Sequence, residues 1–145
     1  MIQRSLAALA LSLSLSAVAL AEPPKVTAVD PAHITAGEAL AIQGESLDKK
    51  NVVEVYLTDG KTDTKLVVTG QTTAAIKATT PANTPVGRLR VMFLTGGANP
   101  QYLEQPVMVV VETASERDER LRQEKEAQIP PPETPAAPAP APSGS

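Results

Sequence analysis

The residue types that most often carry chemistry are scarce in this chain of 145 residues. It has a single histidine, His33, which follows Pro31 in an expected turn, and it has no cysteine. The sequence contains no Gly-x-Ser-x-Gly nucleophile elbow and no Cys/His cluster with zinc-binding spacing. We therefore expect His33 to face solvent, and we expect a protein that is not an enzyme and that carries no metal or cofactor.

Acidic residues offer the other possible chemistry. Asp59 and Asp63 share one loop, DGKTD, which lacks the ligand spacing and the terminal Glu of a calcium loop. Glu54, Glu104 and Glu112 could form an acid pair. With 16 acidic residues in the chain, however, chance pairing is the simpler expectation. Neither group predicts enzymatic activity.

Residues 1–21 have the order of a secretory signal peptide. Arg4 precedes a run of Leu, Ala, Ser and Val from Ser5 to Leu20, and Ala19-Leu20-Ala21 forms a small-residue cleavage site. The alternative is a membrane anchor, but the run is shorter than the roughly 20 residues that span a bilayer. We expect cleavage before Glu22, no transmembrane anchor afterwards, and a periplasmic or extracellular location.

The charge balance excludes one class of partner. The formal net charge is −3, and loss of Arg4 with the signal peptide makes the mature chain more acidic. Nucleic-acid binding requires a dense basic surface. We therefore expect no nucleic-acid partner.

The C-terminal part of the chain differs in composition from the rest. Residues 129–145, IPPPETPAAPAPAPSGS, are rich in Pro and Ala and predict a disordered, polyproline-like tail. The tail is either an idle solubilising segment or a spacer that docks elsewhere. The preceding segment, residues 113–128, is highly charged and predicts a helix, with Ser115 as its N-cap and Asp118 three residues on. Because Leu121 is its only large apolar residue, the helix is either solvated and frayed or induced by a partner.

Residues 25–112 form the only segment that predicts a folded domain. Short Val-, Ala-, Leu- and Ile-rich runs, separated by Gly, Pro, Asn and Asp, are typical of an all-β fold. About seven strands at this spacing predict an immunoglobulin-like two-sheet sandwich. The expected strands are Lys25–Val29, Glu38–Gly44, Val52–Thr58, Lys65–Thr69, Thr73–Ala78, Gly87–Leu94 and Pro106–Val111.

Alternation within these strands predicts the core. Side chains two positions apart share one face of a strand. With one Phe and no Trp, the core must be aliphatic. The residues expected in it are Leu40, Ile42, Val53, Val55, Leu57, Leu89, Val91 and Phe93.

The order of these turns and strands resembles the IPT/TIG domain. The resemblance rests on a strand that ends at Pro31, a Gly-x-x-Leu-x-Ile-x-Gly pattern from Gly37 to Gly44, a Val-rich strand at 52–57, and a Pro crossover from Pro81 to Gly87. The family implies an immunoglobulin-like fold and a binding, dimerising or spacing role, and it supplies no catalytic residues. The chain departs from the family pattern at 95–105, TGGANPQYLEQ, which we expect to be a long functional or mobile loop.

The third, sixth and seventh expected strands should lie in one sheet. Its outward residues would include Glu54, Thr58, Leu94, Met108 and Val110, which are either part of an interface or covered by the C-terminal segment or by loops. Exposed Tyr, Arg and Met side chains are typical of interfaces. The residues expected to bind a partner are Tyr56, Arg88, Arg90, Met92 and Tyr102.

Together these features predict an exported, non-enzymatic interaction or scaffolding module. Its expected partner is a protein or another envelope component, and homodimerisation is possible. The alternative is a carbohydrate-binding accessory module, since the family occurs beside glycan-acting enzymes. The absence of Trp weakens that alternative, because sugar-binding faces usually use aromatic platforms.

Overall fold

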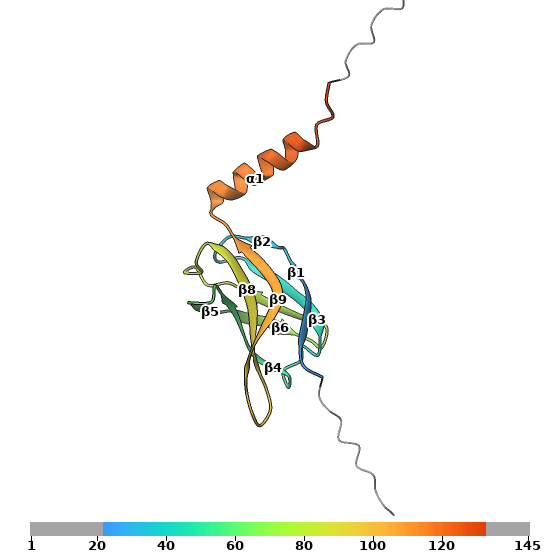
Figure 1. Ribbon diagram of the computed structural model, residues 1–145, viewed down its shortest axis with the longest axis vertical. Coiled ribbons are helices and arrows are strands. Elements are labelled where there is room, and N and C mark those ends of the chain that lie inside the picture. Colours follow the sequence, from blue (N-terminus) through green and yellow to red (C-terminus); the bar gives the residue numbers. More distant parts are fainter. Residues whose placement is uncertain (1–21, 133–145) are drawn as a thin grey trace, which may run out of the picture.

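The computed structural model describes residues 22–132 and shows two facing β-sheets followed by one helix (Figure 1). The signal peptide and most of the Pro-rich tail were expected at 1–21 and 133–145, which lie outside the described residues. The seven expected strands are present, Val52–Thr58 with the expected bounds and the other six with shifted ends, and two short strands, β2 and β5, are added. The elements are β1 Lys25–Asp30, β2 His33–Ile34, β3 Ala39–Glu45, β4 Val52–Thr58, β5 Asp63–Lys65, β6 Val67–Gln71, β7 Ala75–Thr79, β8 Gly87–Thr95, β9 Tyr102–Val111 and α1 Ala114–Ala127.

The strands form a four-stranded and a five-stranded sheet. The first has the order β1-β3-β7-β6 and the second β2-β9-β8-β4-β5. All neighbours are antiparallel except β2, which pairs in parallel with β9. The all-β expectation is confirmed, as is the expectation that the strands now labelled β4, β8 and β9 share one sheet.

The core between the sheets is aliphatic, as the composition required. Leu40 and Ile42 of β3 face Leu89, Val91 and Phe93 of β8 across one cluster of buried residues. All five are less than a tenth exposed, so the period-two prediction is confirmed in both strands. Removal of this apolar surface from water is the main favourable contribution to folding.

Strand β4 breaks the predicted alternation at its first residues. Its pairing with β8 shifts between Val52 and Glu54, which marks a bulge. Val52 is buried and the side chain of Val53 is 57% exposed, whereas Val55 and Leu57 are buried as expected. The prediction that Val53 lies in the core is therefore wrong, because a bulge inserts a residue and changes which side chains face inward.

The segment expected to be a long loop is mostly a hairpin. Strand β8 continues to Thr95 and β9 begins at Tyr102, so only residues 96–101 connect them. The Thr95 N–H donates to the Gln101 carbonyl and the Gln101 N–H donates to the Thr95 hydroxyl, both at 2.9 Å. In Figure 1 this hairpin projects from the end of the sandwich opposite α1. The Gly- and Pro-rich composition predicted a loop, but it describes only the hairpin tip.

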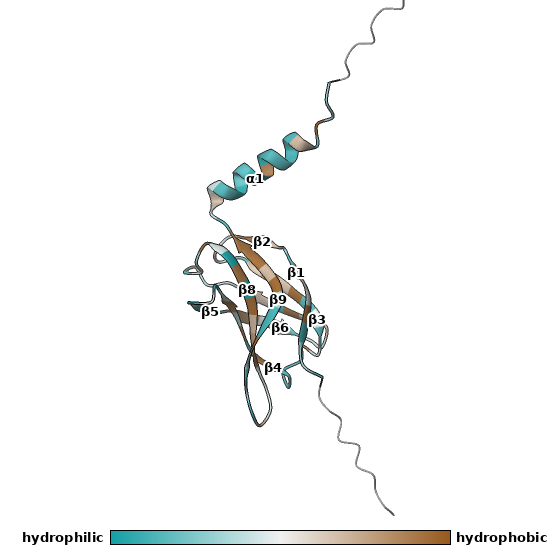
Figure 2. Ribbon diagram, in the orientation of Figure 1, coloured by the Kyte–Doolittle hydropathy of each residue, from teal (hydrophilic) through white to brown (hydrophobic). Residues whose placement is uncertain are grey.

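Helix α1 leaves the sandwich after β9 and buries none of its residues. Its N-cap is Thr113 rather than Ser115: the Glu116 N–H donates to the Thr113 hydroxyl, and the Thr113 N–H donates to the Glu116 carboxylate. This reciprocal pair forms a capping box. Figure 2 shows a mainly hydrophilic helix, and within residues 22–132 no helix has the length and apolarity needed to cross a bilayer.

Candidate functional site

The outer face of the β2-β9-β8-β4-β5 sheet carries a set of large, accessible side chains, which we call the Tyr–Arg face. They come from three adjacent strands, β4, β8 and β9, whose register brings them together. By contrast, the exposed residues of the other sheet are small or polar, with Val67 as the large apolar exception. The Tyr–Arg face consists of Tyr56, Arg88, Arg90, Tyr102, Glu104 and Met108.

Two tyrosines meet edge to face on this surface. The ring centroids of Tyr56 and Tyr102 are 5.8 Å apart, with an interplanar angle of 70°. The Tyr56 hydroxyl donates to Glu54, whose other oxygen accepts from the Lys65 ammonium. The carboxylate of Glu54 holds the pKa of Tyr56 above its usual range, and Lys65 and then Tyr56 lower the pKa of Glu54. Tyr56 is thus fixed as a neutral phenol, whereas Tyr102, 62% exposed, is the ring that a partner can reach.

Met92 was expected to be exposed on the outward face and to bind a partner. The expected exposure is wrong. It pairs with Tyr56 on one side and with Glu104 on the other, so side chains from both neighbouring strands flank it. Its side chain is 6% exposed. It therefore supports the Tyr–Arg face from below and does not offer a contact surface.

The sequence left two expectations for this face: either it is an interface, or the C-terminal segment or loops cover it. The exposure of Met108 and its neighbours helps to distinguish them. Met108 is 43% exposed, while Leu94 and Val110 are half-buried. Helix α1 buries no residue and extends away from the sandwich (Figure 1). Among the residues that the structure describes, the C-terminal segment therefore leaves the Tyr–Arg face open.

The two arginines line a pocket of about 310 Å³ at one end of the face. Arg90 lies between Thr58 of β4 and Met108 of β9, and its guanidinium is 3.4 Å from the Glu104 carboxylate. Thr58 was expected to be exposed but is buried, and its hydroxyl accepts the Gly60 N–H at 3.0 Å in the turn that follows β4. The pocket is lined by Thr58, Asp59, Gly60, Arg88, Arg90, Glu104 and Met108.

Sequence reasoning missed the part of this pocket that comes from the β4–β5 turn. It considered Asp59 and Asp63 only as possible calcium ligands. The available signal was the Asp-Gly turn directly after a strand, since a turn at a strand end lies beside the neighbouring strand. Lys65, which holds Glu54, was missed because its pairing depends on β5, a strand that the pattern did not predict.

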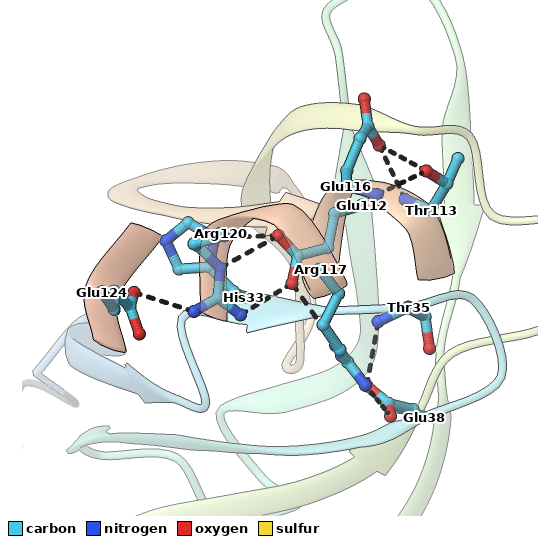
Figure 3. Close-up of polar contacts among 9 residues, drawn as sticks. All are labelled: His33, Thr35, Glu38, Glu112, Thr113, Glu116, Arg117, Arg120 and Glu124. Atoms are coloured by element: carbon cyan, nitrogen blue, oxygen red, sulfur yellow. Dashed lines mark hydrogen bonds and ion pairs between the residues drawn. The ribbon is translucent and has the colours of Figure 1, made fainter. Parts of the chain in front are cut away.

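A second polar cluster fixes the first turns of α1 to the sandwich (Figure 3). Arg120 donates through Nη2 and Nε to the two oxygens of Glu112, at 2.8 and 3.1 Å. Arg117 forms a bidentate pair with Glu38, whose Oε2 also accepts the Thr35 N–H. These arginines hold the pKa of Glu38 and of Glu112 at about 2. We call this cluster the helix clamp.

The helix clamp corrects two sequence expectations. The charged segment forms a helix that is tied to the domain, whereas the sequence left it either frayed or induced by a partner. His33 does not lie in a turn but in β2, and its Nδ1 is 3.5 Å from the Glu112 carboxylate. Sequence alone could not pair Arg117 with Glu38, because they lie 79 residues apart.

The acidic residues considered for catalysis are each engaged by cations. Glu54 pairs with Lys65, Glu104 with Arg90, and Glu112 with Arg120. Within residues 22–132, no group of three or more His, Asp or Glu side chains is arranged to hold a metal ion.

Two facing sheets with this strand order define an immunoglobulin-like β-sandwich, a class that presents faces and loops for recognition. The sequence model of the IPT/TIG domain family matches residues 24–106, more than half of the chain. The chain therefore belongs to the IPT/TIG domain family, as the resemblance of its turns and strands indicated.

One of two similar solved structures supports the fold, and the fold alone. A protein of unknown function from Bacteroides thetaiotaomicron is similar with a TM-score of 0.53 and 19% identity, over 63% of this chain and 22% of that chain. A putative phosphatase from the same organism gives a TM-score of 0.45 and 18% identity, over 63% of this chain and 18% of that chain. The chain thus spans about a fifth of the length of these two proteins. No curated protein matches it.

Proposed function

We propose that this chain is an exported, non-enzymatic interaction module that binds a protein component of the cell envelope through the Tyr–Arg face. The observation that carries the proposal is the contrast between the two sheets. One presents Tyr102, two arginines and Met108 on adjacent strands, and the other presents mainly small or polar side chains.

The composition of the face favours a protein partner. Tyr and Arg are the residue types, with Trp, that most often carry binding energy in protein interfaces. The side chains stand on paired strands, and Tyr56 is held by Glu54. The Tyr56 ring therefore loses little conformational freedom on association, which favours affinity.

Export is supported by the sequence of residues 1–21, which has the order of a secretory signal peptide. The family membership supports a non-enzymatic role, since the IPT/TIG resemblance supplies no catalytic residues. A second copy of the chain is one possible protein partner, and the test below includes it.

Capture of partners by purified variants tests the proposal. Tyr102→Ala and Arg90→Ala should each weaken capture of a specific envelope protein, or self-association in light scattering, at least about tenfold. Lys77→Ala, an exposed change on the opposite sheet, is the matched control and should capture as the unmodified protein does. If both face variants capture normally while remaining folded, the Tyr–Arg face is not the binding surface.

A carbohydrate ligand is the second candidate, favoured by the single accessible ring of Tyr102. The geometry supports it less well, because Tyr56 meets that ring at 70° and so does not extend it into a flat stacking platform. Retention of the protein on insoluble cell-wall polysaccharide, lost in Tyr102→Ala and kept in Arg90→Ala, would favour the sugar over the protein.

A further inference from the structure

The cations of the Tyr–Arg face and its edge differ in whether they have an ionic partner. Lys65 is paired with Glu54 and Arg90 with Glu104. Arg88 is exposed, and within residues 22–132 it has neither an ion pair nor a side-chain hydrogen bond. One guanidinium of the face is thus available for a partner group.

Arg88 lines the pocket of about 310 Å³ together with Arg90. The two residues alternate outward along β8, so both guanidiniums belong to the same face of the sheet. Met108 of β9 pairs with Arg90 and adds an apolar wall. The pocket therefore combines two cations with a surface on which the methylene groups of an entering side chain can pack.

The carboxylates of the pocket are already engaged. Asp59 Oδ1 accepts the N–H groups of Lys61 and Thr62 at 2.8 and 2.6 Å, and these bonds lower the pKa of Asp59. The Glu104 carboxylate is 3.4 Å from Arg90, and both side chains are about half exposed. Asp59 thus stays ionised but is held within its own turn, Arg88 is the cation of this pocket that has no ion pair within residues 22–132, and the long, exposed Arg90–Glu104 pair can open to admit another anion.

We propose that this pocket receives a carboxylate from an acidic segment of the protein partner, with Arg88 as its principal ligand. Guanidinium and carboxylate groups match as planar, bidentate partners. An entering Glu side chain would pair with Arg88, draw Arg90 away from Glu104, and lay its methylenes on Met108. The inference rests on the proposed function, because the pocket is one end of the Tyr–Arg face.

Titration of the ¹⁵N-labelled protein with an acetylated hexaglutamate peptide tests this inference. The largest shifts should fall on the amides of Gly60, Arg88 and Arg90, and they should shrink as salt is added, since exposed charge interactions are screened. Hexaglutamine should cause no comparable shifts. Shifts scattered over the surface, or centred on Lys77, would overturn the proposal.

Arg88→Gln is the decisive variant, and Lys77→Gln is its control on the other sheet. Arg88→Gln should weaken hexaglutamate binding at least about fivefold, with the amides of the buried Ile42 and Phe93 unchanged as a check on folding. Lys77→Gln should bind as before. Equal binding by both variants would overturn the proposal, as would a saturable Arg88-dependent response to inorganic phosphate without one to hexaglutamate.

The two proposals can fail separately. If Arg88→Gln captures the envelope partner normally while Tyr102→Ala does not, the proposed function stands and the carboxylate pocket is excluded. If hexaglutamate binds through Arg88 but Tyr102→Ala and Arg90→Ala both capture normally, the pocket is real and the larger face is not the partner surface.

Discussion

At the scale of single residues, small irregularities in strand pairing determine which side chains of the five-stranded sheet reach solvent. The bulge at the start of β4 turns Val53 outward. A second irregularity, between Arg90 and Met92 of β8, shifts the partners on β9 from Met108 to Glu104. Such shifts decide which residues a partner meets, and composition does not report them.

The bulge in β4 gives a test with a matched pair of valines in one strand. Val55→Ala should lower the free energy of unfolding by about 2 kcal/mol or more, because it removes buried methyl groups and leaves a cavity. Val53→Ala should change it by less than about 0.5 kcal/mol, as is usual for an exposed position. Urea denaturation measures both. Equal losses would mean that β4 has no bulge and that both valines are buried.

The predicted binding residues differ in whether strand alternation gave their exposure correctly. Simple alternation placed Arg88 and Arg90 correctly at exposed positions, whereas Tyr102 was expected in a loop and lies at the start of β9. It failed for Met92, which is flanked by Tyr56 and Glu104 on the neighbouring strands and is 6% exposed. A periodic pattern reports the face on which a residue lies but not what covers it.

At the scale of elements, α1 is joined to the sandwich by the helix clamp rather than by apolar contact. Helices of globular proteins usually dock through an apolar stripe, and α1 has no buried residue. Glu112 comes just before the helix, so its pairs with Arg117 and Arg120 bridge the junction, and Arg117 reaches back to Glu38. Local propensity could predict the helix, but the clamp requires the three-dimensional fold.

Because the helix clamp consists of ion pairs, we expect the mobility of α1 to depend on pH. The arginines lower the pKa of Glu38 and Glu112 from 4.5 to about 2 in the folded state. Since the folded pKa lies below the unfolded value, the clamp contributes fully above about pH 4.5 and is lost as the pH falls towards 2. We expect ¹⁵N relaxation to show α1 rigidly attached from pH 5 to 8 and increasingly mobile below about pH 4.

Two variants check that this response comes from the clamp. Arg117→Gln should make α1 more mobile at pH 7, because it removes the bidentate pair with Glu38. Arg90→Gln, which disrupts an ion pair far from the helix, should leave α1 unchanged. A helix whose relaxation is the same in all three proteins would show that the ion pairs do not hold it.

At the scale of the whole molecule, the chain places its helix at one end of the sandwich and the β8–β9 hairpin at the other (Figure 1). The Tyr–Arg face lies on the sheet between these ends. The all-β class, the core of β3 and β8 and the family were predictable from turns and alternation. The helix clamp was not, because it pairs residues distant in sequence, and the Asp-Gly signal of the β4–β5 turn did not by itself show that the turn lines a pocket with Arg88 and Arg90.

For the whole molecule we predict export with cleavage of a signal peptide. Removal of residues 1–21 should give a product that begins at Glu22, because Ala19-Leu20-Ala21 has the small residues that signal peptidase requires. Intact-mass measurement of the protein from the periplasm or culture medium checks it. Changing Ala19 and Ala21 to Arg should leave the longer precursor. An exported protein that retains Met1 to Ala21 would contradict the assignment.

Site-specific photo-cross-linking in intact cells tests most directly whether the Tyr–Arg face binds a protein partner. A photo-reactive amino acid is placed at Tyr102 in one strain and at Lys77, on the opposite sheet, in another. We expect a discrete cross-linked protein adduct from position 102 and none from position 77, and we expect Arg90→Ala to reduce the adduct. Equal adducts from both positions, or an adduct from position 77 alone, would contradict the claim that the Tyr–Arg face binds the partner.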